Sequence, residues 1–174
     1  MTSILTIILL LLLLSMPVRA DTVRKVGDYL QIAIPAFALG RTYGNSDHEG
    51  LRQMSTGLVA NLAMTQIIKE STNQLRPDGS DRLSFPSGHT SAVFQGAAFV
   101  HRRYGLEYAW PHYLGASVVA YSRVHANRHH IRDVVGGALL GTAVSWTLTT
   151  QQNQVQYSFG ISPEFRGLFV TKAF

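Results

Sequence analysis

Three basic side chains stand beside apolar segments of the sequence, where they could hold the oxygens of a phosphate group. They are Lys69, Arg76 and Arg123. A guanidinium can bind two phosphate oxygens at once, and a lysine adds a compact positive charge. Ser87 and Gly88 directly precede another apolar segment. The free N–H groups at the start of a helix attract anions, and a glycine lets the ligand approach the backbone. These residue types together predict a phosphate-binding site.

Two histidines and one carboxylate could supply the reactive groups at that site. His129 and Asp133 are four residues apart and would share one face of a helix. Asp133 could then hold one imidazole nitrogen and leave the other as a nucleophile. His89 is a second imidazole, suited to protonating a leaving oxygen. Because fixed cations can neutralise the phosphoryl oxygens as a metal ion would, the set predicts phosphoryl transfer without a metal or other cofactor.

In order and spacing, these residues resemble the type-2 phosphatidic acid phosphatase family, which also contains bacterial class A acid phosphatases and vanadium haloperoxidases. The three motifs of that resemblance are Lys69-x6-Arg76-Pro77, Pro86-Ser87-Gly88-His89 and Ser122-Arg123-x5-His129-x3-Asp133. The resemblance covers roughly Gln53–Leu148, and three motifs in order are far more specific than any one of them. Only eight residues separate Pro77 from Pro86, which is short for the family and leaves the substrate open.

The resemblance implies a fold and a role for each residue. The fold would be an antiparallel helical bundle with the site at one end. His129 would be the nucleophile, Asp133 its partner and His89 the general acid. The phosphate-binding residues would be Lys69, Arg76, Ser87, Gly88 and Arg123.

The apolar segments after the first 20 residues predict five helices. They are Tyr29–Leu39, Gln53–Ile68, Thr90–Val100, Tyr108–Tyr121 and Val134–Leu148. The alternating tail from Val155 to Val170 predicts a short hairpin that packs on the bundle. The expected fold is therefore all-α, a bundle of five to six helices with a C-terminal β-hairpin. The expected domains are a helical phosphatase domain at 21–152 and a hairpin tail at 153–174.

The first 20 residues are expected to be a signal peptide or an N-terminal anchor. Ile4–Leu14 is almost wholly apolar, and Val18-Arg19-Ala20 has small residues where cleavage before Asp21 would need them. Only 14% of the chain is charged, against about 25% in soluble domains, and its net charge is +5. We therefore expect an inner-membrane protein with an outward-facing site, or a periplasmic protein after cleavage. We expect its partner to be a phosphorylated lipid or a small phosphate ester, and we expect no nucleic-acid partner.

Alternative interpretations remain at several positions. The same site could hold vanadate and oxidise halides, or could serve water-soluble esters as a periplasmic acid phosphatase. A non-enzymatic role in binding membranes or nucleic acids is less favoured, because the basic residues sit at motif positions. His125 and His129 could suggest a metal, although the frame of a zinc hydrolase is missing. Arg102 and Arg103 are expected to be solvated or to compensate the helix dipole. His112 is expected at a surface or interface, and Gly136, Gly137 and Gly141 are expected to allow close helix packing.

Overall fold

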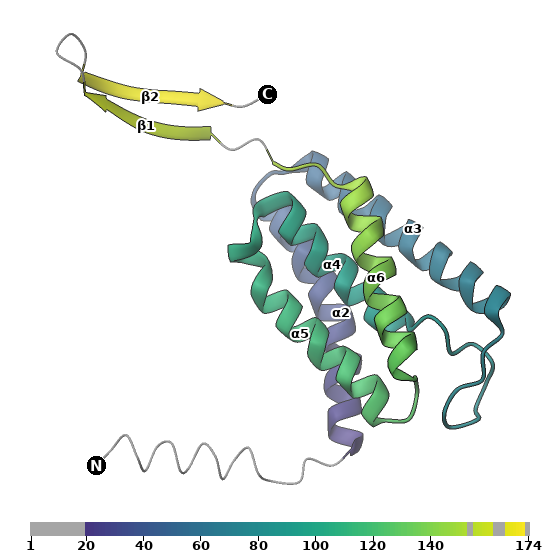
Figure 1. Ribbon diagram of the computed structural model, residues 1–174. Coiled ribbons are helices and arrows are strands. Elements are labelled where there is room, and N and C mark those ends of the chain that lie inside the picture. Colours follow the sequence, from purple (N-terminus) through teal and green to yellow (C-terminus); the bar gives the residue numbers. More distant parts are fainter. Residues whose placement is uncertain (1–19, 153–154, 162–165, 173–174) are drawn as a thin grey trace, which may run out of the picture.

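Five helices lie side by side and form one bundle in the computed structural model, which describes residues 20–152, 155–161 and 166–172 (Figure 1). They are α2 (Ala20–Gly44), α3 (His48–Thr72), α4 (Gly88–Tyr104), α5 (Leu106–His125) and α6 (Ile131–Leu148). This confirms the expected helical bundle. The expected signal peptide or anchor falls on residues 1–20, of which all but Ala20 lie outside the described part.

Each helix extends beyond its apolar segment, because polar residues complete its ends. The Asp47 side chain accepts a hydrogen bond from the Gly50 N–H at 2.9 Å and caps the start of α3. Asn73 ends the same helix in the left-handed conformation, with φ of 46°. Ser87 caps the start of α4 through its side-chain oxygen. The polar ends matter for function, since the residues of the three motifs lie there.

Helix α4 is the centre of the bundle and contacts each of the other four helices. Two glycines of α6 bring its backbone directly against α4. A Cβ at Gly137 would collide with the Ser87 carbonyl oxygen, and one at Gly141 would collide with the Ser91 carbonyl oxygen. The expected close packing at these glycines is confirmed, and it fixes the starts of α4 and α6 next to each other.

Two groups of buried apolar side chains hold the other helices to α4. One contains Ala38, Met54, Phe99, Val100, Tyr104 and Ala109, and the other contains Ile34, Val93, Ala116 and Val119. His112 was expected at a surface or an interface, but it is only 8% exposed, with its ring 5.2 Å from that of Phe37. The ring is buried because α5 turns this position toward α2.

Arg103 was expected to be solvated, and this expectation was wrong. Its guanidinium is buried and binds both carboxylate oxygens of Asp47. Tyr104 donates its hydroxyl to the same carboxylate at 2.8 Å. The three side chains tie the end of α4 to the turn between α2 and α3. A buried arginine is stable there because its charge is fully paired.

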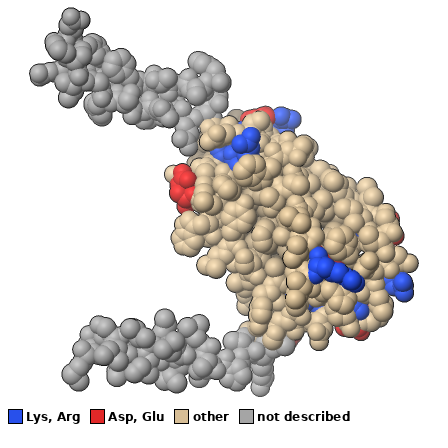
Figure 2. Space-filling model, viewed as in Figure 1, with Lys and Arg blue, Asp and Glu red and all other residues tan. Residues whose placement is uncertain are grey.

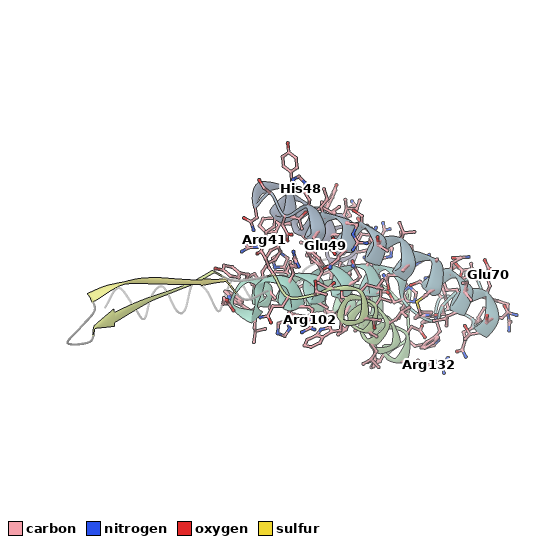
Figure 3. The ribbon with its side chains drawn as sticks, turned by 90° about the horizontal axis from the view of Figure 1, so that it is seen from above. Arg41, His48, Glu49, Glu70, Arg102 and Arg132 are labelled. Atoms are coloured by element: carbon pink, nitrogen blue, oxygen red, sulfur yellow. The ribbon has the colours of Figure 1, made fainter. Side chains whose placement is uncertain are left out.

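On the face drawn in Figure 2, charged side chains gather toward the two ends of the bundle, and the surface between them is almost free of charge. Arg41, His48 and Glu49 lie at one end, and Glu70 and Arg132 lie at the other (Figure 3). Large apolar side chains are exposed between the ends, among them Ile32, Val59, Ile67, Leu114 and Leu139. Within the part of the chain that is described, no helix is both long and apolar enough to cross a membrane.

The backbone after α6 forms two short strands, β1 (Val155–Ile161) and β2 (Arg166–Lys172). They pair antiparallel, with Tyr157 opposite Val170 and Phe159 opposite Leu168. The side chains of this segment lie outside the described residues. The division into a helical domain and a hairpin tail, and the packing of the tail on the bundle, therefore stay predictions.

Candidate active site

The three motifs meet in one cavity at the end of the bundle that carries Glu70 and Arg132 (Figures 1 and 3). The ends of α3 and α5, the starts of α2 and α4 and the loop before α6 surround it. Its volume is about 570 Å³. The lining residues are Arg24, Asp28, Lys69, Arg76, Gly88, His89, Arg123, Arg128 and His129. Six of the eight residues singled out in the sequence are among them, and Ser87 and Asp133 are buried nearby without lining it.

His129 presents Nε2 to a guanidinium at the cavity. Nη1 of Arg76 lies 3.1 Å from that nitrogen and also donates to the Arg128 carbonyl oxygen at 3.1 Å. The imidazole is only 4% exposed. Burial, with the positive charges of Arg76 and Lys69, lowers the pKa of His129 to about 4. The ring is therefore neutral at physiological pH, which is the state that a nucleophile requires.

Asp133 lies below the histidine, fully buried at the start of α6. Its Oδ2 accepts hydrogen bonds from the Ser84 hydroxyl at 2.5 Å and from the His130 N–H at 2.8 Å. The distance from Oδ2 to Nδ1 of His129 is 3.6 Å, longer than a hydrogen bond. The two residues do not share the helix face that the spacing predicted, because His129 lies in the loop before α6. The loop nevertheless brings the imidazole next to Asp133, and the structure adds Ser84, which no motif indicated.

The loop from Asn73 to Phe85 holds Arg76 in place. The Arg76 N–H donates to the Asp81 carbonyl oxygen, and the Arg76 Nε lies 2.7 and 2.8 Å from the two carboxylate oxygens of Asp81. On the other side of the loop, Arg128 Nη1 donates to Asp78 at 2.8 Å. The eight residues between the first two motifs are therefore enough to fix one cation over His129.

Lys69 reaches the cavity from the last turn of α3. Its Nζ donates to the Leu83 carbonyl oxygen at 2.5 Å, and the residue is 9% exposed. Burial and the nearby positive charge of Arg76 lower the pKa of Lys69 to about 8. The side chain is mostly charged at neutral pH and can attract an anion.

The start of α4 forms the floor of the cavity at Gly88. The Ser87 N–H donates to the Asp133 carbonyl oxygen, and the Ser87 hydroxyl accepts from Thr90. Ser87 is therefore a helix cap buried behind the cavity, and its expected contact with phosphate stays a prediction. Gly88 lies at the surface of the cavity, where the helix N-terminus attracts negative charge.

A carboxylate that the sequence reasoning missed links the last two site residues. Asp28 of α2 accepts from Arg123 Nη1 at 2.7 Å and lies 3.3 Å from Nε2 of His89. Arg123 is buried and also donates to the Arg24 carbonyl oxygen at 2.8 Å. Burial and the charge of Arg123 lower the pKa of His89 to about 4, against the opposing effect of Asp28.

Across residues 20–152, no group of three or more His, Asp or Glu side chains is arranged to hold a metal ion. His125, one half of the possible pair with His129, is exposed and stacks on Tyr121 at 5.3 Å.

A family model described as the PAP2 superfamily matches residues 50–157, which is more than half of the chain. The chain belongs to the PAP2 superfamily. This confirms the resemblance carried by the three motifs.

Three known proteins are similar to this chain. A lipid A 4′-phosphatase of Helicobacter pylori is 26% identical over 162 residues, which cover 85% of this chain and 81% of that protein. A lipid A 1-phosphatase of Porphyromonas gingivalis is 40% identical over 79 residues, which cover 44% of this chain. The match spans only 18% of that second relative. The crystal structure of LpxE from Aquifex aeolicus has the same fold, with a TM-score of 0.55, 21% identity, and coverage of 72% of this chain and 90% of that one.

Proposed function

We propose that the protein is a phosphatase that hydrolyses phosphate monoesters or lipid (pyro)phosphates through a phosphohistidine on His129. The observation that carries this proposal is a neutral, buried imidazole whose Nε2 meets a guanidinium at a cation-lined cavity. An incoming phosphate dianion would draw Arg76 onto its own oxygens, since a guanidinium binds phosphate more strongly than a neutral imidazole. Nε2 would then be free to attack.

In the first step Nε2 of His129 bonds to phosphorus, and the bond from phosphorus to the leaving oxygen breaks. His89 gives its proton to that oxygen. Lys69, Arg76, Arg123 and the N-terminus of α4 neutralise the equatorial oxygens. In the second step the water oxygen bonds to phosphorus and the bond from phosphorus to Nε2 of His129 breaks. His89 takes a proton from the water, inorganic phosphate leaves, and His129 is again a free imidazole.

His89 must be protonated for the first step, although its pKa is about 4 without a ligand. A phosphate dianion beside the ring would favour the imidazolium, because an opposite charge nearby raises the pKa of a histidine. Substrate binding would therefore supply part of the acidity that the step needs.

The substrate we propose is a phosphorylated lipid of the bacterial envelope, such as a lipid A phosphate. Two similar proteins are lipid A phosphatases. The uncharged, apolar surface between the charged ends of the bundle supports a lipid environment, since exposed apolar surface of this extent usually contacts a partner or lipid (Figure 2). The site would face outward from the inner membrane or into the periplasm.

The test is phosphate release by purified protein in EDTA, from phosphorylated lipids and from water-soluble aryl phosphates. We expect turnover without added metal and inhibition by vanadate, which mimics the trigonal transition state. Activity that EDTA abolishes and zinc or magnesium restores would contradict the mechanism. Turnover of soluble esters alone would keep the chemistry and reject the lipid substrate.

The roles of the two histidines separate in a leaving-group experiment. His129→Ala removes the nucleophile and should abolish turnover of every substrate. His89→Ala removes only the acid, so 2,4-dinitrophenyl phosphate, whose leaving group needs no proton, should restore much of its activity. Equal rescue of both variants, or phosphate trapped on His89, would reverse the assignment.

A further inference from the structure

Asp28 belongs to none of the three motifs, yet it lies between Arg123, a proposed phosphate-binding residue, and His89, the proposed general acid. Its Oδ1 is the atom that both Arg123 Nη1, at 2.7 Å, and His89 Nε2, at 3.3 Å, approach. Close packing of α2 on α5 brings it there. A Cβ at the neighbouring Gly27 would collide with the Ser122 hydroxyl and with the guanidinium of Arg123. The backbone of α2 is thus pressed against the end of α5, and the next side chain enters the cavity.

The other charged groups around His89 are almost all positive. The groups that line the cavity with it are Arg24 and Asp28 from α2, Lys69 from α3, Arg123 from α5, and Arg76, Arg128 and His129 from the loops. Asp28 is the carboxylate among these lining residues. Without it, an imidazolium at His89 would have no negative charge among the lining residues to stabilise it until substrate arrived.

We propose that Asp28 is the positioning residue of the general acid, holding the Nε2–H of His89 so that Nδ1 carries the proton for the leaving oxygen. This inference rests on the proposed phosphatase function. The site would then contain two histidine–aspartate pairs with different roles. Asp133 serves the nucleophile His129, and Asp28 serves the general acid His89. A carboxylate on one ring nitrogen fixes the tautomer and stabilises the imidazolium, as it does in other histidine-dependent sites.

The proton movements balance over the cycle. When the bond from phosphorus to the leaving oxygen breaks, the Nδ1 proton of the His89 imidazolium moves to that oxygen. The neutral ring keeps its Nε2–H toward Asp28, so its lone pair is on Nδ1. That lone pair accepts a proton from the water that attacks the phosphohistidine, and the imidazolium is restored.

Asp28 also has a cost for substrate binding. Its carboxylate occupies Arg123 Nη1, a donor that a phosphate oxygen would use, and it repels an incoming dianion. Removing the charge should therefore leave phosphate affinity unchanged or increase it. A residue that only held Arg123 in place would show the opposite, since phosphate binding would weaken on its loss.

The decisive variant is Asp28→Asn, compared with Asp21→Asn as the matched control. Asp21 lies two turns earlier on α2, pairs with Arg24 and Lys25, and does not line the cavity. Aryl phosphates with leaving groups from phenol to 2,4-dinitrophenol report the need for a proton, and inorganic phosphate as a competitive inhibitor reports anion binding. Asp28→Ser provides a second variant if the amide disturbs folding, with thermal unfolding as the check.

For Asp28→Asn we expect kcat/KM for phenyl phosphate to fall by about 10²-fold or more. The loss for 2,4-dinitrophenyl phosphate should be below about tenfold, and the inhibition constant of phosphate should not rise. The alkaline limb of the pH profile, where His89 loses its proton, should move to lower pH, because the loss of the carboxylate lowers the pKa of His89. Asp21→Asn should match the parent in all of these measurements.

A loss that is equal for all leaving groups, together with weaker phosphate inhibition, would overturn the inference and leave Asp28 as a support for Arg123. A variant indistinguishable from Asp21→Asn would overturn it as well. If the parent protein hydrolyses none of the aryl phosphates or lipids, the proposed function fails instead. The pairing would then be decided by nuclear magnetic resonance, since the His89 ring should titrate at lower pH in Asp28→Asn than in the parent.

Discussion

Nη1 of Arg76 lies 3.1 Å from Nε2 of His129, the proposed nucleophile, and both residues line the cavity. Arginine has only N–H donors, so a hydrogen bond between the two requires a lone pair on Nε2. The proton of the neutral ring then lies on Nδ1, on the side of Asp133. The ligand-free site thus holds the tautomer that the proposed attack needs, and we expect a bound phosphate to draw Arg76 onto its own oxygens before the attack.

The first prediction concerns this arginine. Arg76→Lys keeps the positive charge but cannot bind Asp81 and His129 together through a planar guanidinium. We expect kcat/KM for aryl phosphates to fall by about 10²-fold, with weaker inhibition by phosphate. The matched control is Arg82→Lys in the same loop, because Arg82 is exposed and its Nε donates only to the Asn73 side chain. Equal kinetics for the two variants would contradict a role for Arg76 at phosphorus.

The second prediction follows from Lys69. Because burial and Arg76 lower its pKa to about 8, Lys69 loses its charge as the pH rises above that value. Inorganic phosphate is a dianion throughout this range, so its inhibition should weaken above pH 8, by at most about tenfold per pH unit. Lys69→Arg should remove this dependence, since arginine stays charged. Phosphate inhibition measured from pH 7 to 9.5 provides the check, and an unchanged slope in Lys69→Arg would assign the titration to another group.

The motif residues could be placed from the sequence because their spacing relative to helix ends carries the information. His129 and Asp133 are four residues apart around the start of α6, and Gly88 begins α4, so their placement near helix ends required no knowledge of distant contacts. Asp28 could not be found in this way. It is a single acid before an apolar segment, and its partner Arg123 is 95 residues away in the chain.

Arg103 was misjudged for the same physical reason. A basic residue at the end of a helix is usually solvated, and only the fold reveals that Asp47, 56 residues earlier, lies against it. Helix lengths were underestimated because apolar periodicity reports the buried face of a helix. The polar first and last turns of α2 and α3 depend on capping and ion pairs instead.

The third prediction concerns Ser84, the buried residue whose hydroxyl donates to Asp133 at 2.5 Å. In Ser84→Ala, Oδ2 of Asp133 keeps only the hydrogen bond from the His130 N–H, so the Asp133 side chain can turn away from His129. We expect kcat to fall by about tenfold or more with little change in KM, because Asp133 touches the nucleophile and not the substrate. Ser84→Thr should recover part of the loss. Ser80→Ala, in the exposed part of the loop, is the control, and a rise in KM alone would show that Ser84 shapes the cavity instead.

The fourth prediction tests the far end of the bundle, where the Asp47–Arg103 pair is buried. Burial alone would raise the pKa of Asp47, but hydrogen bonds from Arg103, Gly50 and Tyr104 outweigh it and hold the pKa below its usual 3.8. The pair therefore stabilises the fold above pH 3.8, and its contribution is lost as the pH falls through the lower folded-state pKa.

Asp47→Ala leaves the Arg103 guanidinium buried without its counterion, so the free energy of unfolding should drop by about 3–5 kcal/mol. Glu49→Ala, which breaks the exposed pair with Arg52 and a hydrogen bond from Gln53, should cost less. Chemical denaturation at pH 7 measures the free energy of unfolding of both variants. At temperatures where Asp47→Ala is still folded, its kcat/KM should equal that of the parent, since the pair lies at the opposite end of the bundle from the cavity. Equal losses of stability in the two variants would mean that Arg103 finds water or another acceptor when Asp47 is removed.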